Sequence, residues 1–276
     1  MAISDRAGED LTRKQRREST RAQRKIIEEA QAAKAITRRR LTQLGIVVVI
    51  VAAGFVAAII STNGAGDAKQ VAPGSIEART TEDTVNALLG GIPQHGNTLG
   101  RPAAPVTLQC FSDLECSICK DFALGALPSL IQTSVRAGKL RIEYRSLQTA
   151  TREPAVFKSQ QLAALAAGQQ NRLWQFVETF YHEQGEEGSG YVTENYIEGI
   201  ARQVTGLGMP QWTRARNDTG LVNQLSTDAK TANNVGLNGT PSFLIGRTGG
   251  AMKRLHYASA TDATSFNEAV ETLPQR

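Results

Sequence analysis

The sequence predicts an α/β domain that carries a helical insert and is preceded by one N-terminal transmembrane helix. Three observations lead to this prediction. A run of twenty uncharged residues, Leu41 to Ile60, follows a basic tail. Strand-like segments lie at 106–111 and 140–144, and again after residue 241. The stretch from about 153 to 235 is helical in character, with Gly, Pro and acidic breaks between its segments.

The positive charge of the chain lies almost entirely in its first forty residues. They carry twelve Lys or Arg against six Asp or Glu, whereas the net charge of the whole 276-residue chain is +5. The remaining 236 residues therefore have a net charge of −1. We interpret residues 1–40 as a cytoplasmic basic tail, and we expect no nucleic-acid partner.

The uncharged run is long enough to cross a membrane. Its unbroken apolar part, from Leu44, is 17 residues long, near the minimum for a helix rising about 1.5 Å per residue across about 30 Å. A buried core helix is rarely apolar on every face, and a forty-residue charged lead is too long for a cleavable signal peptide. We predict a signal anchor at 41–61 in contact with membrane lipid.

The charges also predict the orientation of the anchor. The positive-inside rule places the basic tail in the cytoplasm and the large C-terminal part outside. The expected location is therefore the cell membrane, single-pass, with an extracytoplasmic domain. Residues 62–91 read as a flexible linker with a short helix at 81–89, and residues 92–276 as the domain.

The domain begins with a strand, a helix and a second strand. The segment 106–111 reads as a buried strand that ends at a Ser-Asp turn. A helix is expected to begin near Cys116 and to run toward Gly138, with a kink at Pro128. The segment 140–144 then alternates as a strand does.

The second half of the domain follows the helical insert, expected at about 153–235. Strands are predicted at 242–245 and 253–257, and a last helix at 263–273. The predicted order is therefore β-α-β, a helical insert, and β-β-α.

The chemical signature of the chain is Cys116-Ser117-Ile118-Cys119, at the start of the first domain helix. Thiol–disulfide exchange needs one thiolate to attack and a second thiol to resolve the mixed disulfide, and this spacing lets both sulfurs meet across one helical turn. The helix N-terminus favours a thiolate at Cys116, and we expect Cys119 to be buried and to act second. Three cysteines in so long a chain cannot form a structural disulfide framework.

A zinc site is the competing interpretation of the cysteine pair. Zinc prefers four ligands, usually two such pairs or one pair with spaced histidines. Only Cys110, His95, His182 and His256 remain, and none lies at ligand spacing. We expect neither a metal nor a cofactor.

Three stretches of the domain resemble the DsbA-like family, particularly its membrane-anchored actinobacterial branch. They are LGRPAAPVTLQCFSDLECSICKDF, AALAAGQQNRLWQFVETFY and VGLNGTPSFLIG, within residues 92–275. The resemblance implies a thioredoxin-like fold with an inserted helical domain, and Cys116 as the exposed nucleophile. It also implies that Thr240-Pro241 lies opposite the cysteine pair. This X-Pro bond is expected to be cis, with the Thr240 backbone pairing with an extended client segment; an ordinary trans turn is the alternative.

Two features beside the thiols are expected to tune them, and the first departs from the family. Ser117-Ile118 stands where Pro-His or Pro-Tyr is common. Without a His to donate to Cys116, the thiolate is less favoured and the disulfide less oxidising. Glu115 acts in the same direction by disfavouring a nearby anion, unless it is merely a solvated carboxylate.

Cys110 has two interpretations. In the family this strand position often holds a buried Asp or Glu that shuttles the proton of the second thiol. The thiol in its place is either a small buried hydrophobe, the usual fate of free Cys, or part of a slower route that deprotonates Cys119.

The leading functional hypothesis is an extracytoplasmic thiol–disulfide oxidoreductase that introduces disulfides into secreted or envelope proteins. By resemblance, a quinone-linked membrane partner of the DsbB or VKOR type reoxidises it. Two alternatives stay open. One is a reductase or isomerase working from the dithiol form, which Ser117-Ile118 and Thr240 favour. The other is a non-catalytic thioredoxin-fold adaptor of a membrane complex.

Overall fold

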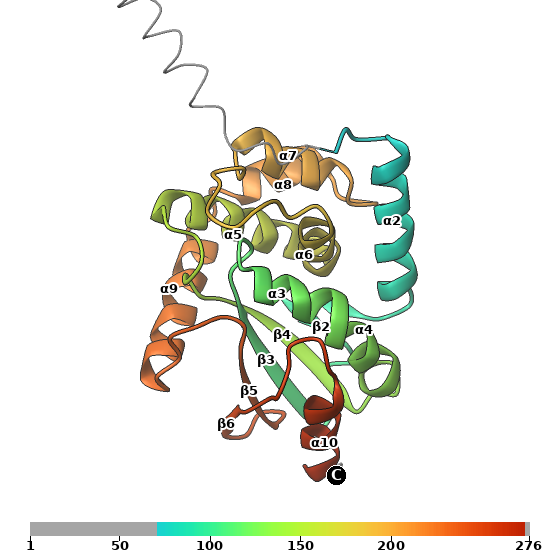
Figure 1. Ribbon diagram of the computed structural model, residues 1–276, viewed down its shortest axis with the longest axis vertical. Helices are drawn as coiled ribbons and strands as arrows, with labels where there is room; N and C mark the ends of the chain where they lie inside the picture. Colours follow the sequence, from blue (N-terminus) through green and yellow to red (C-terminus); the bar gives the residue numbers. More distant parts are fainter. Residues whose placement is uncertain (1–70, 274–276) are drawn as a thin grey trace, which may run out of the picture. The chain divides into compact units, whose positions relative to one another are not determined.

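The computed structural model describes residues 71–273 (Figure 1). Three predicted parts lie wholly or partly outside the described residues: the basic tail at 1–40, the signal anchor at 41–61 and residues 62–70 of the linker. Among the described helices, none is both long enough and apolar enough to cross a bilayer.

Six strands of the described region form one sheet in the order β1-β2-β4-β3-β5-β6. The two central strands, β3 (Val106–Ser112) and β4 (Leu140–Ser146), are parallel. The outer strands pair antiparallel: β5 (Ser242–Arg247), β6 (Met252–Leu255), β1 (Gln94–His95) and β2 (Thr98–Leu99). The predicted β-α-β and β-β-α units are thus halves of a single sheet.

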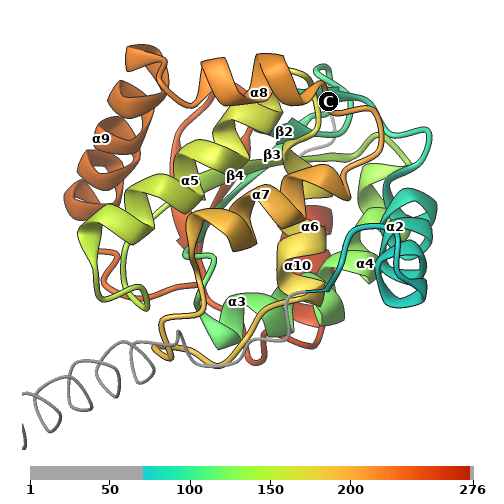
Figure 2. The ribbon, with the colours of Figure 1, turned by 90° about the horizontal axis from the view of Figure 1, so that it is seen from above.

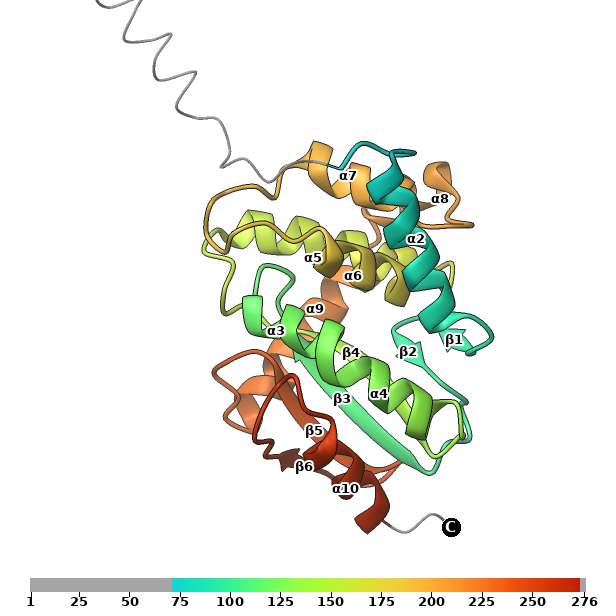
Figure 3. The same ribbon diagram turned by 45° about the vertical axis from the view of Figure 1, so that its right-hand side comes forward.

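A continuous helical run follows β3 and lies along β3 and β4 (Figure 3). It consists of α3 (Ser117–Asp121), η1 (Phe122–Ala126), α4 (Leu127–Leu130) and η2 (Ile131–Val135). Pro128 has no N–H to donate, and its ring conflicts with α-helical geometry in the turn before it. The run accommodates Pro128 with π-helical turns on both sides, such as the bond from Leu127 N–H to the Phe122 carbonyl.

The insert between β4 and β5 is helical, as predicted. It contains α5 (Pro154–Gly168), α6 (Leu173–His182), α7 (Glu194–Arg202), α8 (Met209–Ala215) and α9 (Thr219–Asn234). In Figure 2, which views the domain from above, α5, α7 and α8 lie in front of the strands. Helix α5 packs against each of the other four insert helices, which explains why residues 160–168 are all buried.

The two faces of the sheet bury different cores, because side chains alternate along a strand. Cys110 and Phe243 face the helical run and the C-terminal helix α10 (Thr264–Thr272), where the rings of Phe122 and Phe266 meet. Phe111 belongs to a smaller cluster on the other face, with Ala232 of α9.

Helix α2 (Ile76–Leu89) begins five residues earlier than the helix predicted at 81–89. The Ser75 hydroxyl caps its first turn by accepting from Ala78 N–H at 3.1 Å. At its other end the Arg136 guanidinium donates to the carbonyls of Gly90 and Leu88 at 3.0 and 2.9 Å. The β1–β2 hairpin after it was not predicted, since two-residue strands leave no alternating pattern.

Candidate functional site

Cys116 is the N-cap residue of α3, directly after the loop that leaves β3. Its Sγ accepts a hydrogen bond from Cys119 N–H at 3.4 Å and donates to the Thr240 carbonyl at 3.3 Å. All three cysteines are free thiols, so the structure shows the dithiol form. The local geometry is the one expected from the motif, a thiol placed at the start of a helix.

The pKa values of the two thiols of the motif are shifted in opposite directions. Hydrogen bonding from the Cys119 thiol, from the Thr240 hydroxyl and from the N–H groups of Cys119 and Ile118 lowers the pKa of Cys116 to about 7, against the opposing effect of burial. Burial and the hydrogen bond to Cys116 raise the pKa of Cys119 well above its ordinary value. At neutral pH, Cys116 therefore supplies the thiolate while Cys119 keeps its proton.

The expectation that Cys116 is exposed is wrong. Only 5% of its surface is accessible, and 1% of that of Cys119. The Thr240 backbone lies against its sulfur, and the Gln184 side chain donates to its carbonyl oxygen at 3.1 Å. Ile118, in contrast, is 51% exposed and marks the outer surface of the motif.

The Thr240–Pro241 peptide bond is cis, as predicted. It precedes β5, and its carbonyl groups are engaged on both sides. Thr240 O accepts from Cys116 Sγ, and Pro241 O accepts from the Tyr257 hydroxyl at 3.0 Å. The two segments about 120 residues apart thus meet at one place; the role of Thr240 in binding a client stays a prediction.

Cys110 lies on β3, buried beneath the motif, with its Sγ 3.2 Å from the Ser112 hydroxyl. Burial raises the pKa of Cys110 to about 12, only partly offset by this hydrogen bond. Its thiol is therefore neutral near pH 7 and is not itself a base there. Any part of Cys110 in deprotonating Cys119 stays a prediction.

Glu115 is not a solvated carboxylate, since only 4% of its surface is accessible. Burial is the main cause of its raised pKa, and the charges of Asp113 and Glu187 add to it. Ser117 donates to Glu187, a residue that sequence reasoning did not single out. Three acidic side chains therefore lie around the start of α3, namely those of Asp113, Glu115 and Glu187.

Asp113 organises the loops around the thiols and was also missed as a functional residue. Its fully buried carboxylate accepts N–H bonds from Glu115 at 3.2 Å and from Thr149, Ala150 and Thr151 at 2.9–3.0 Å. The sequence signal was present as the Ser-Asp turn after the first strand. What the sequence did not show is the second loop that the carboxylate holds.

That second loop reaches the cis peptide. The Thr149 hydroxyl forms a short hydrogen bond with the Thr240 hydroxyl. A chain of contacts therefore runs from Asp113 through the loop after β4 to Thr240, and from there to Cys116. The position of the carbonyl that contacts the nucleophile depends on this buried carboxylate.

Glu178 of α6 is a second buried acid near the site. Its side chain is fully buried, and neither carboxyl oxygen has a hydrogen-bond partner. Burial raises the pKa of Glu178 to about 8, and the charge of Glu178 in turn contributes to the raised pKa of Cys110. An acid with this pKa is largely protonated at neutral pH.

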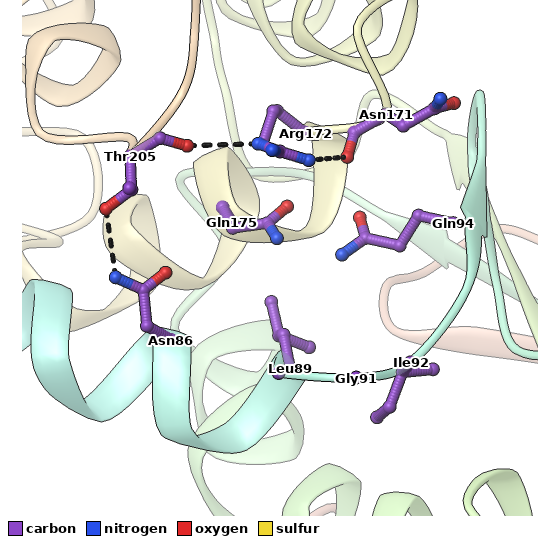
Figure 4. A pocket seen from close by; sticks show the side chains of 10 residues that line it. Asn86, Leu89, Gly91, Ile92, Gln94, Asn171, Arg172, Gln175 and Thr205 are labelled. Carbon is purple, nitrogen blue, oxygen red and sulfur yellow. Dashed lines mark hydrogen bonds between the residues drawn. The ribbon is translucent and has the colours of Figure 1, made fainter.

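Two hollows in the surface differ in their relation to the thiols. A groove of about 270 Å³ runs beside the cis peptide and is lined by Thr240, Pro241, His256 and Tyr257 among others. A polar cavity of about 330 Å³ lies between the end of α2 and the start of α6, where Gln94 and Arg172 are among its lining side chains (Figure 4). The groove adjoins the redox motif through Thr240, whereas none of the residues that line the cavity belongs to the motif or to the cis peptide. Within residues 71–273 no cluster of side chains suits a metal ion.

Comparisons with known proteins agree with this geometry. The thioredoxin family model matches residues 94–255, more than half of the chain. A relative named "Probable disulfide bond formation protein D", from Bacillus cereus, is 23% identical over 155 residues, covering 54% of this chain and 68% of the relative.

Solved structures share the fold. BdbD from Bacillus subtilis in its oxidised form superposes with a TM-score of 0.54 at 18% identity, covering 65% of this chain and 95% of BdbD. DsbA2 from Pseudomonas aeruginosa gives 0.51 at 19% identity, covering 66% and 95%. With the cysteine pair at the start of α3, these findings show that the chain belongs to the thioredoxin family and is a thiol–disulfide oxidoreductase that shares its fold with DsbA and BdbD.

Proposed function

We propose that the chain introduces disulfides into secreted or envelope proteins by using the Cys116–Cys119 couple as a disulfide donor. The observation that carries the exchange is the placing of the pair: Cys116 Sγ caps α3 beside the cis peptide, and Cys119 is buried one turn later. A pKa of about 7 makes Cys116 a good leaving group, and the pKa of Cys119 is raised well above its ordinary value. The relatives named for disulfide bond formation favour the donor direction.

The reaction begins when a client thiolate attacks Cys116 Sγ in the oxidised protein. The Cys116–Cys119 bond breaks, a mixed disulfide forms, and Cys119 leaves as a thiolate that takes up a proton. A second client thiolate then attacks the client sulfur of the mixed disulfide and releases Cys116 as a thiolate. The client loses two electrons and gains a disulfide, and the protein is reduced to the dithiol seen here.

Client binding is proposed at the groove beside the cis peptide. An extended segment placed there would bring its cysteine toward Cys116 and pair with the Thr240 backbone. The lining of the groove combines Thr240 and Pro241 of the cis peptide with Arg254, His256 and Tyr257 from the end of β6 and the residues after it.

The proposed setting is the outer face of the cell membrane, with residues 41–61 as the anchor and residues 1–40 in the cytoplasm. A quinone-linked membrane partner of the DsbB or VKOR type would accept the two electrons and restore the disulfide. Removing residues 1–61 should move the protein from the membrane to the soluble fraction. Retention of the shortened chain in the membrane fraction after alkaline washing would argue against this anchor.

A second candidate function is a reductase or isomerase that rests in the dithiol form. The acidic groups around the nucleophile favour it, because Glu115 and Glu187 lie beside the place where the thiolate forms. Negative charge there disfavours the thiolate and makes the disulfide less oxidising.

The reduction potential decides between these functions. We would equilibrate the full-length chain, in detergent, with glutathione buffers and determine the fraction of Cys116–Cys119 disulfide. A value near about −120 mV would make the protein a disulfide donor, and one near about −270 mV a reductase or isomerase. The absence of any reversible couple would leave only the adaptor.

Trapping tests the roles of the two thiols. In a Cys119→Ser variant the mixed disulfide on Cys116 has no internal thiol to resolve it, so client proteins should accumulate in reducible adducts. The matched control is Cys110→Ser, which keeps both motif thiols and should trap nothing. Equal trapping by both variants would contradict the assigned roles.

A further inference from the structure

The segment between α6 and α7, residues 183–193, lies directly against the start of α3. Gln184 Nε2 donates to the carbonyl oxygens of Leu114 and Cys116 at 2.7 and 3.1 Å. Lys120 Nζ donates back to the Gln184 carbonyl at 3.4 Å. The helical insert therefore contacts the redox motif itself and does not merely cover it.

Glu187, within this segment, accepts two hydrogen bonds at the first residue of α3. The N–H and the hydroxyl of Ser117 each lie 3.0 Å from the same oxygen, Oε2. Cys116 Sγ accepts from Cys119 N–H instead, because a capping side chain takes the N–H of the second or third helical residue. A carboxylate and a thiol thus occupy one helix end, each with its own donors.

The two groups share this helix end at an electrostatic cost when Cys116 is ionised. The positive end of the helix dipole favours either anion, but a second negative charge close by disfavours the first. In the disulfide form Cys116 carries no charge and Glu187 has no anion to repel. The Glu187 carboxylate therefore destabilises the dithiol form and leaves the energy of the disulfide form unchanged.

We propose that Glu187 is a positioning residue that lowers the oxidising strength of the Cys116–Cys119 couple. The proposal rests on the thiol–disulfide exchange proposed above. The oxidising strength is given by the equilibrium of the protein with glutathione. Two glutathione thiols reduce the Cys116–Cys119 bond and become glutathione disulfide, so that two electrons and two protons pass to the cysteine pair. Cys116 then releases its proton to water. Glu187 forms no bond in this exchange; it changes the energy of the thiolate that results.

The test compares Glu187→Gln with Glu186→Gln in the full-length chain. Both side chains are exposed and the two variants change the net charge equally, but only Glu187 accepts from Ser117. For Glu187→Gln we expect the pKa of Cys116, followed by thiolate absorbance, to fall. The glutathione equilibrium should shift about tenfold toward the dithiol, which corresponds to about 30 mV. The difference should shrink at high salt, because screening weakens the repulsion.

Two results would overturn the proposal: an unchanged potential in Glu187→Gln, or an equal shift in Glu186→Gln. A reversible couple in the unmodified chain together with either result rejects the role of Glu187 and leaves the proposed exchange intact. If the unmodified chain shows no reversible couple, the proposed function fails first. Thermal unfolding of each variant, expected to match that of the unmodified chain, shows whether the fold is retained.

Discussion

A single carboxylate, that of Asp113, connects the strand, the thiol motif and the cis peptide. Its oxygens accept backbone N–H bonds from residues on both sides of the site: Glu115, Thr149, Ala150 and Thr151. Each of these donors would lack a partner in the interior if the carboxylate were lost, and an unsatisfied buried donor costs about 1–3 kcal/mol. At the residue scale, the site depends on this acid as much as on the cysteines.

Replacing Asp113 with Asn should therefore destabilise the domain and disturb the nucleophile. The new NH₂ group would face N–H donors, and we expect the free energy of unfolding to fall by roughly 2–4 kcal/mol. Because the Thr240 hydroxyl, which contacts the Thr149 hydroxyl and helps to lower the pKa of Cys116, loses its support, that pKa should rise. Urea denaturation and a thiolate titration measure the two effects. Asp121→Asn, at an exposed position on α3, is the control and should change neither.

Glu178 should make stability fall as pH rises. In the unfolded chain a Glu side chain has a pKa of about 4.3. In the folded protein the pKa of Glu178 is raised to about 8. Between these values the folded state binds more protons, so raising the pH favours unfolding. The resulting decrease in the free energy of unfolding is at most about 5 kcal/mol. The decrease is complete once the pH exceeds the pKa of Glu178 in the folded protein.

The check is the free energy of unfolding of the unmodified chain and of Glu178→Gln at pH 5 and pH 8. The variant should lose clearly less stability between the two values, because a neutral amide has no proton to release. Parallel pH profiles for the two proteins would contradict this account of Glu178.

The helical run after β3 shows how one proline changes an element without ending it. Because Pro128 cannot donate a hydrogen bond, π-helical turns form on both sides of it and the run continues to Val135. The same run approaches the segment before α10 very closely at Gly125. A Cβ atom there would lie 2.8 Å from the Thr261 Cα.

Gly125→Ala should accordingly push η1 away from the C-terminal segment. Overpacking of this kind costs about 1–3 kcal/mol, seen as a lower denaturation midpoint. Gly239→Ala is the control for stability, since a Cβ there meets no atom within 4 Å. A stable Gly125→Ala protein would show that the backbone at Thr261 moves aside freely.

The domain as a whole includes a helix from the segment interpreted as a linker. Val85 and Leu89 of α2 are buried in the main core, and α2 packs against α6 of the insert. Arg136, the residue directly after the helical run, caps the C-terminus of α2. Helix α2 is therefore part of the structure that supports the insert and, through it, residues 183–193.

Shortening the chain to begin at residue 92 should be far more damaging than shortening it to begin at residue 71. Exposing the core beneath Val85 and Leu89 loses roughly 3–6 kcal/mol, a large share of the 5–15 kcal/mol typical of a domain. Thermal unfolding of the two shortened proteins measures this difference. Equal midpoints would show that α2 is dispensable.

The sequence by itself determined the order of the predicted strands and helices and the cysteine motif at a helix start. These features are local, because they depend on alternation and on the spacing of two thiols. The cis bond before β5 follows only from the family resemblance, since an X-Pro bond taken alone still favours trans. The extension of α2 to Ile76 and the two-residue strands were missed because capping and short pairings leave little pattern in the chain.

Only the tertiary structure decided which groups surround the thiols. Asp113, Glu178 and Glu187 reach the site from a loop, from α6 and from the segment after it, and their effects depend on burial and on distances that no local pattern contains. The near-complete burial of Cys116 has the same origin, because the Thr240 backbone lies about 120 residues away in sequence and 3.3 Å away in space. Acidity and redox strength are set by such contacts, so the motif identifies the reaction while the fold sets its energy.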